Sequence, residues 1–178
     1  MTDKYWIANN PNSECTDAEA TALGALTQTE IEILDGCTAT SAEINANCDV
    51  LTEAVTTTNV IAASETGTHF VLNSATAFVS TLPAPAAGLE FWFHAGATQV
   101  TGGNHTIVTN ASANIIEGSI MSREVSALVA GVAAADTISF VADLAVQGDM
   151  AHVWSDGTDW YLDGHCFVQD GMTTTQAS

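Results

Sequence analysis

The chain has 178 residues, the length of one domain or of one domain with an arm. It carries 21 Asp and Glu residues against 2 Lys and Arg residues, so its formal net charge is −19. This charge excludes direct binding to a nucleic-acid backbone, which requires clustered cations, and it argues against binding to an anionic membrane surface. Apolar residues make up 47% of the chain, which excludes an acidic disordered tail.

The first twelve residues lack the basic and apolar stretches of a signal peptide, and no apolar run approaches the roughly 20 residues of a membrane span. We therefore expect a protein made without export. None of the four cysteines belongs to a C-x-x-C pair, which disfavours a zinc site. Reduced thiols packed as small apolar side chains are expected, and disulfides within or between chains are the alternative. The cysteines are Cys15, Cys37, Cys48 and Cys166.

Three capping-box patterns recur in the first third of the chain, at residues 16–19, 27–30 and 40–43. In each, the Thr hydroxyl can accept a hydrogen bond from the third helical amide while the Glu reaches back to the cap. Apolar residues follow each pattern. The sequence therefore predicts an arm and short capped helices within residues 1–54. Their apolar faces need a partner, because helices of two or three turns are marginal alone.

Residues 55–66 are expected to form a connector, because the Thr56-Thr57-Thr58 run is weak in helices. From residue 67 onward, short β-prone stretches are bounded by Gly, Pro and Asp, as is typical of strands. The expected fold class is therefore mainly β, with the N-terminal helices followed by an antiparallel β-sandwich or β-barrel over residues 67–171 and a disordered tail at 172–178. The predicted strands cover residues 69–72, 77–82, 89–94, 105–109, 114–121, 125–129, 137–142, 150–154, 160–162 and 165–168.

The segment Ser155-Asp156-Gly157-Thr158-Asp159 lies between two predicted strands and indicates a hairpin turn. Together with Asp163-Gly164 it resembles a loose calcium loop. The spacing is not that of an EF-hand, however, so two turns are the preferred interpretation.

No catalytic constellation is evident, because the five histidines lie in neither an HExxH nor a GxSxG context. We expect His94 and His152 to be half-buried strand residues. A histidine metal site between subunits on a symmetry axis stays open as the alternative. We expect no catalytic residues, no cofactor and no metal ligand, and hence a protein that is not an enzyme. The other three histidines are His69, His105 and His165.

The aromatic run Phe91-Trp92-Phe93 lies on a predicted strand, where successive side chains point to opposite faces. Trp92 should therefore point away from Phe91 and Phe93. One side of the strand is core, and the other is a second buried face, a subunit interface or a surface that stacks on a sugar. The candidate glycan contacts are Trp92, Trp154 and Trp160.

Two segments of the chain resemble structural proteins of tailed bacteriophages. Residues 27–45 (TQTEIEILDGCTATSAEIN) are similar to their T-x-x-E-[IL]-N-x-L-D-G-x-T-x-T repeat. Residues 148–164 (GDMAHVWSDGTDWYLDG) are similar to their G-D-x-x-x-[LV]-x-S-D-G-T-N-W-Y-V-x-G ending, with Asp159 in place of Asn and Leu162 in place of Val. Residues 82–89 and 102–107 fit the usual sequence upstream of that ending, so the resemblance spans residues 27–165.

The resemblance implies a virion structural protein that forms a homotrimer and contacts the major capsid protein or another virion protein. Only two clear repeats and a weak third are present, which favours a compact capsid decoration (cement) protein or a stubby head fibre over a tail fibre. Its implied location is the outer capsid surface, after synthesis in the cytoplasm of the host bacterium. The alternative is a fibre or adhesion module of the head or tail that binds host-surface glycans. The sequence contains no motif that supports a glycan-depolymerising enzyme. The candidate capsid or subunit contacts are Tyr5, Trp6, Ile7, Leu26, Ile31, Leu34 and Ile44.

Overall fold

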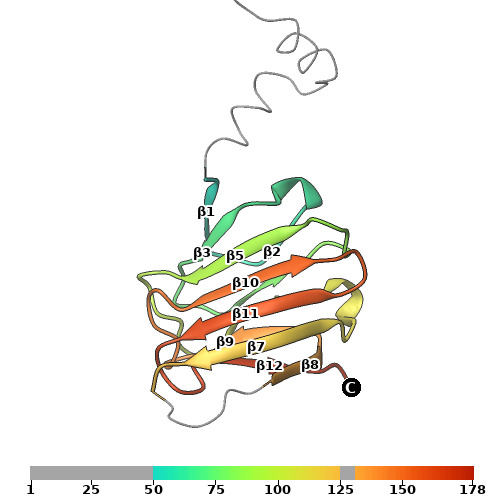
Figure 1. Cartoon of the computed structure of the whole chain (residues 1–178). Helices are drawn as coiled ribbons and strands as arrows, with labels where there is room; N and C mark the ends of the chain where they lie inside the picture. The colour runs from blue at the N-terminus through green and yellow to red at the C-terminus, as the bar shows by residue number, and fades with distance from the viewer. Residues whose placement is uncertain (1–49, 125–130) are drawn as a thin grey trace, which may run out of the picture. The chain divides into compact units, whose positions relative to one another are not determined.

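The computed structural model describes residues 50–124 and 131–178. They form two mixed β-sheets packed as a sandwich, without an α-helix among the described residues (Figure 1). No helix in that part of the chain is long and apolar enough to cross a membrane. Two short 3₁₀ helices, η1 (Ala63–Glu65) and η2 (Asn110–Ser112), lie in the connections. The strands are β1 (Thr52–Val55), β2 (Asn59–Val60), β3 (His69–Leu72), β4 (Phe78–Thr81), β5 (Glu90–Ala95), β6 (His105–Val108), β7 (Ile116–Ser122), β8 (Gly131–Ala135), β9 (Thr137–Phe140), β10 (Met150–Ser155), β11 (Trp160–Cys166) and β12 (Met172–Thr175).

The seven-stranded sheet has the order β1-β3-β5-β10-β11-β7-β8, and the five-stranded sheet has the order β12-β9-β6-β4-β2. The expected sandwich is confirmed, but the expected all-antiparallel pairing is wrong. The pairs β1–β3, β3–β5, β7–β11, β2–β4 and β4–β6 are parallel. For the four pairs among β1 to β6, the reason is that these strands alternate between the two sheets, so each returns to its own sheet through a crossover and in the same direction.

Both ends of the expected β domain need correction. The expected connector, residues 55–66, contains the end of β1, all of β2 and η1. The expected disordered tail contains β12, which pairs with β9. The Thr-rich run of β12 is β-branched and suits an edge strand, and Met172 at its start is only 3% exposed. The helices expected within residues 1–54 and the strand expected at 125–129 lie outside the described residues, except for the segment that forms β1.

Within the described residues, the other predicted strands match observed ones to within a few residues. The two predicted at 160–162 and 165–168 are the single strand β11, which continues through the buried Gly164. A Cβ added there would contact the side chains of Ile120 and Met172. This close approach explains why a glycine that looks like a turn signal lies inside a strand.

The core fills the space between the sheets and follows the period-two alternation of the strands. Phe91 and Phe93 are fully buried, whereas Trp92 between them lies on the opposite face, as predicted. Cys166 is a buried free thiol, as expected for that cysteine, and its burial raises its pKa. Cys15, Cys37 and Cys48 lie outside the described residues. The largest fully buried side chains are Trp160, Phe70, Phe91, Phe93, Phe140, Ile61, Leu72, Leu82, Ile107, Ile116, Ile138 and Val153.

Candidate functional site

Aromatic and titratable side chains gather on the outer face of the seven-stranded sheet, the face turned away from the core. The strand register places Glu90 of β5 opposite Trp154 of β10, Trp154 opposite Tyr161 of β11, and Tyr161 opposite Glu117 of β7. These four residues form a row across four strands, which we call the acid–aromatic row. All four are at least partly exposed, so the row can contact another molecule.

The two rings of the row stack on each other. Their centroids are 4.4 Å apart and their planes differ by 20°, so each ring covers one face of the other. Trp154 is 43% exposed. β10 lies between β5 and β11, so Trp154 has Glu90 as its register partner on one side and Tyr161 on the other. On the other side, Glu117 accepts a hydrogen bond from the Ala134 amide at 3.0 Å, so Glu90 is the less engaged of the two glutamates.

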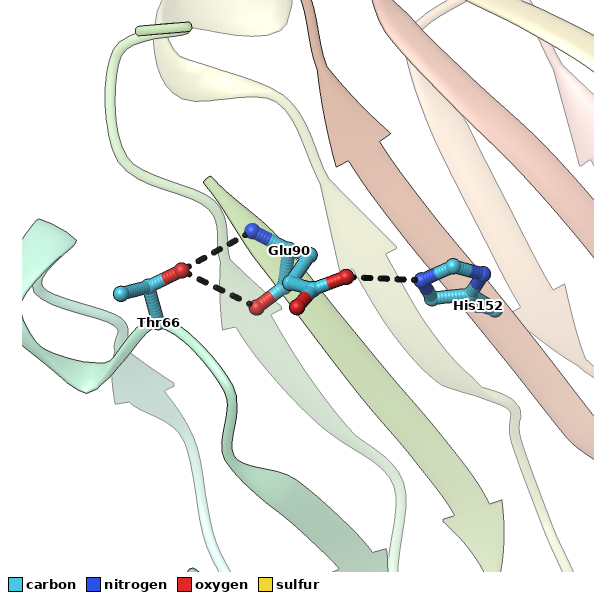
Figure 2. A network of polar contacts seen from close by, with 3 residues as sticks. All are labelled: Thr66, Glu90 and His152. Atoms are coloured by element: carbon cyan, nitrogen blue, oxygen red, sulfur yellow. Dashed lines mark hydrogen bonds and ion pairs between the residues drawn. The ribbon is translucent and has the colours of Figure 1, made fainter. Parts of the chain in front are cut away.

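Glu90 is held at the start of β5 by the loop that precedes β3. Its amide donates to Thr66 Oγ1 at 3.0 Å, and the Thr66 hydroxyl lies 3.5 Å from the Glu90 carbonyl oxygen, as Figure 2 shows. Its carboxylate Oε2 lies 3.6 Å from His152 Nε2, which is beyond hydrogen-bond length but within reach of an ion pair when the imidazole is protonated. The Glu90 side chain remains 47% exposed, so its backbone is fixed while its carboxylate stays accessible.

The β10–β11 hairpin fixes the tyrosine end of the row. The turn predicted at residues 155–159 is confirmed, whereas the one predicted at Asp163-Gly164 is wrong, because both residues pair with β10 inside β11. The Asp156 carboxylate accepts hydrogen bonds from the amides of Asp159 and Thr158 at 3.0 and 2.8 Å, and these bonds lower its pKa. The Tyr161 hydroxyl donates to Asp156 Oδ2 at 3.1 Å, which raises the pKa of Tyr161. Oδ1 of Asp156 therefore closes the turn, and Oδ2 holds the Tyr161 hydroxyl. Within residues 50–124 and 131–178, no three His, Cys, Asp or Glu side chains are placed to hold a metal ion.

A second row of rings lies beside the first. Trp92 is stacked between His69 of β3 and His152 of β10, with centroid separations of 4.8 and 4.4 Å and interplanar angles of 2° and 10°. His69 Nδ1 lies 2.9 Å from Nε2 of His94, so one imidazole donates a hydrogen bond to the other. His94 and His152 are half-buried strand residues, as predicted. This histidine–tryptophan stack leaves only the edge of Trp92 toward solvent.

Two histidines of the sandwich, His94 and His105, favour their neutral forms. Burial lowers the pKa of His94, and the neighbouring His69 lowers it further. Burial also lowers the pKa of His105, which is 3% exposed on the inner face of β6, although its hydrogen bonds to backbone carbonyls oppose the shift. Protonation of either imidazole in the folded protein therefore costs free energy that protonation in the unfolded chain does not.

We expect the free energy of unfolding to decrease as the pH falls below the ordinary histidine value of 6.5. The pKa of His94 is lower in the folded than in the unfolded chain, so acid binds the unfolded chain preferentially. Urea denaturation at pH 7.5 and 5.5 measures the loss. The loss should be smaller in His94→Gln than in the wild type. An equal loss in His94→Gln and the wild type would contradict the assignment.

The three predicted glycan contacts differ in how far their rings are exposed. Trp154 is exposed, as such a role requires. Trp92 has both ring faces covered by histidines. Trp160 is 0% exposed and packs against Phe91 at 5.9 Å between centroids, so its prediction as a surface contact is wrong. The candidate capsid or subunit contacts lie outside the described residues; they are Tyr5, Trp6, Ile7, Leu26, Ile31, Leu34 and Ile44.

Sequence reasoning missed Tyr161, Glu90 and Glu117 as members of the site. Tyr161 could have been found from the hairpin, since a four-residue turn after Ser155 places Tyr161 opposite Trp154. The two glutamates join the row through the pairings of β5 with β10 and of β7 with β11. These strands are far apart in the sequence, and no local pattern reports their pairing.

Comparison with known proteins yields no match: no protein-family model, no curated protein and no solved structure is similar to the chain at a significant level.

Proposed function

We propose that this chain is a structural protein of a tailed-phage virion that decorates and stabilises the outer capsid surface as a trimer. The observation that carries the proposal is the resemblance over residues 27–165, whose parts occur in one order along one chain. Its C-terminal segment, residues 148–164, coincides with the β10–β11 hairpin in the middle of the seven-stranded sheet. A net charge of −19 suits a protein displayed in many copies, because like charges keep neighbouring copies soluble.

The proposed mechanism is thermodynamic linkage. A protein that binds the assembled shell but not the separate capsid subunits stabilises the shell by its binding free energy. Trimerisation would increase the effect, since three linked contacts bind with a higher effective concentration than three separate ones. This mechanism requires no catalytic group, in keeping with the expectation of a protein that is not an enzyme.

Immunogold labelling of purified virions tests the location. Antibodies raised against the full chain should label the heads of intact particles at many points. Labelling confined to the tail would contradict capsid decoration and support the fibre alternative. Particles that contain none of the chain, by labelling and by mass spectrometry, would remove the virion role altogether.

The proposed trimer gives a prediction for the mass in solution. Light scattering behind a sizing column should give the full chain three times its 18.4 kDa. A shortened chain of residues 50–178, which keeps all of β1, should be monomeric if residues 1–49 hold the trimer together. A trimer of the shortened chain would move the subunit contacts to the sandwich. A monomeric full chain would contradict the trimer.

A further inference from the structure

We propose that the acid–aromatic row binds a cationic group, the guanidinium or ammonium of an arginine or lysine side chain on a protein partner. The proposal goes beyond the virion role, because it concerns the chemistry that the sandwich recognises and holds for any partner that presents such a group. It rests on the free indole face of Trp154 and on the carboxylate of Glu90 beside it.

The indole supplies the first half of the site. Trp154 is 43% exposed and has one ring face covered by Tyr161, so the uncovered face is available to a ligand. A tryptophan face carries negative electrostatic potential and attracts a cation more strongly than any other side-chain ring. A planar guanidinium can also stack on it.

The carboxylate of Glu90 supplies the second half. Glu90 is the register partner of Trp154 on the adjacent strand, and its side chain is 47% exposed. A cation that stacks on Trp154 therefore has an accessible carboxylate on the adjacent strand to pair with. The nearest basic group to Glu90 in the described structure is His152, at 3.6 Å. The Glu90 amide donates a hydrogen bond to Thr66, and β5 pairs with β10. The backbone positions of Glu90 and Trp154 are therefore fixed before a ligand binds.

The remaining charges favour a cationic ligand as well. Asp156, Asp159 and Glu117 lie around the tyrosine end of the row and contribute to the raised pKa of Tyr161. The chain's two basic residues other than histidine are Lys4 and Arg123, and Arg123 lies over the Phe167 ring at 5.9 Å. A surface of one sign in a protein of net charge −19 attracts a partner of the opposite sign and repels acidic ones.

The same geometry fits a sugar less well. Trp154 and Tyr161 cover one another, and Trp92 is covered on both sides, so the three rings do not form a broad open platform. The register partner of Trp154 on β5 is Glu90, whose carboxylate matches a cation better than a neutral pyranose. Saccharide binding is therefore a separate outcome of the experiment below.

Isothermal titration of the full chain with a hexa-arginine peptide tests the proposal, with a hexa-citrulline peptide as the uncharged control of the same size. We expect binding of the arginine peptide and none of the citrulline peptide. Trp154→Ala should weaken binding about two- to fivefold, in line with the usual strength of a cation–π contact at an exposed site, and Trp154→Phe should restore part of the loss.

A charge-matched pair of variants separates the site from general attraction to an acidic protein. Glu90→Gln and Glu53→Gln each remove one negative charge, but Glu53 is an exposed residue of β1, three strands away from β10. Glu90→Gln should weaken binding several-fold more than Glu53→Gln. The proposal is overturned by unchanged affinity in Trp154→Ala, by equal effects of the two glutamine variants, or by Trp154-dependent binding of maltohexaose in place of the arginine peptide. Circular dichroism of each variant confirms that it is folded.

Discussion

Replacing Trp160 with alanine should remove a large part of the stability of the sandwich, whereas the same replacement at Trp154 should change it little. Trp160 is 0% exposed and packs on Phe91 between the sheets. Truncating a buried tryptophan typically costs about 3–5 kcal/mol, against a total stability of about 5–15 kcal/mol for a domain. Trp154 is 43% exposed on the outer face, where substitutions usually change stability by about 0.5 kcal/mol.

Urea denaturation of the two variants at one pH measures this difference. Both substitutions remove the same atoms, and both residues lie on paired strands, so each variant is the control for the other. Equal losses of stability would contradict the register that places Trp160 inward and Trp154 outward. A folded Trp154→Ala chain would also establish that a loss of binding in that variant reports on the site.

Gly118→Ala should be the most damaging addition of a single methyl group to the described sandwich. Gly118 lies in β7 with φ at +142°, where the register with β8 shifts. An added Cβ would meet the backbone carbonyl of Leu162 on β11. The unfavourable φ costs about 1–3 kcal/mol for a residue with a side chain. Relief of the clash would also pull apart the parallel β7–β11 pairing. We expect a total loss of at least about 3 kcal/mol.

Gly131→Ala is the matched control for this change. Gly131 starts β8, next to β7, but within residues 50–124 and 131–178 no atom lies within 4 Å of a Cβ added there, and its φ is not in the left-handed range. Since alanine loses less backbone freedom on folding, we expect a change within about 1 kcal/mol of the wild type. The two melting temperatures decide the matter. If Gly118→Ala melts together with Gly131→Ala, β7 does not approach β11 as described.

Alternation and turn chemistry carried most of the strand prediction. In residues 89–94 the buried Phe91 and Phe93 alternate with Trp92, so the sequence predicts both the strand and which side chains lie on each of its faces. The Asp156-Gly157 turn identified the β10–β11 hairpin. These features are local, since each depends on residues only a few positions apart.

The features that sequence reasoning missed depend on contacts between distant segments. The sequence predicts a disordered tail at Thr173, Thr174 and Thr175. They form a strand, β12, only through their pairing with β9, which no local pattern reports. Trp160 was misplaced because a shift of one residue in a hairpin exchanges the inner and outer faces. Predicting the candidate site would also require the order of the strands. Glu90 and Glu117 lie beside Trp154 and Tyr161 only because β5 pairs with β10 and β7 pairs with β11.

Heat-induced genome release from virions tests the proposed capsid role most directly. Particles made with and without the gene for this chain are heated with a DNA-binding dye, and purified full-length chain is then added back to the deficient particles. We predict that deficient particles release their genome at a lower temperature and that added chain restores the original value, because a ligand of the assembled shell stabilises it. Identical release temperatures in all three samples would contradict the role of this protein as a capsid-stabilising decoration.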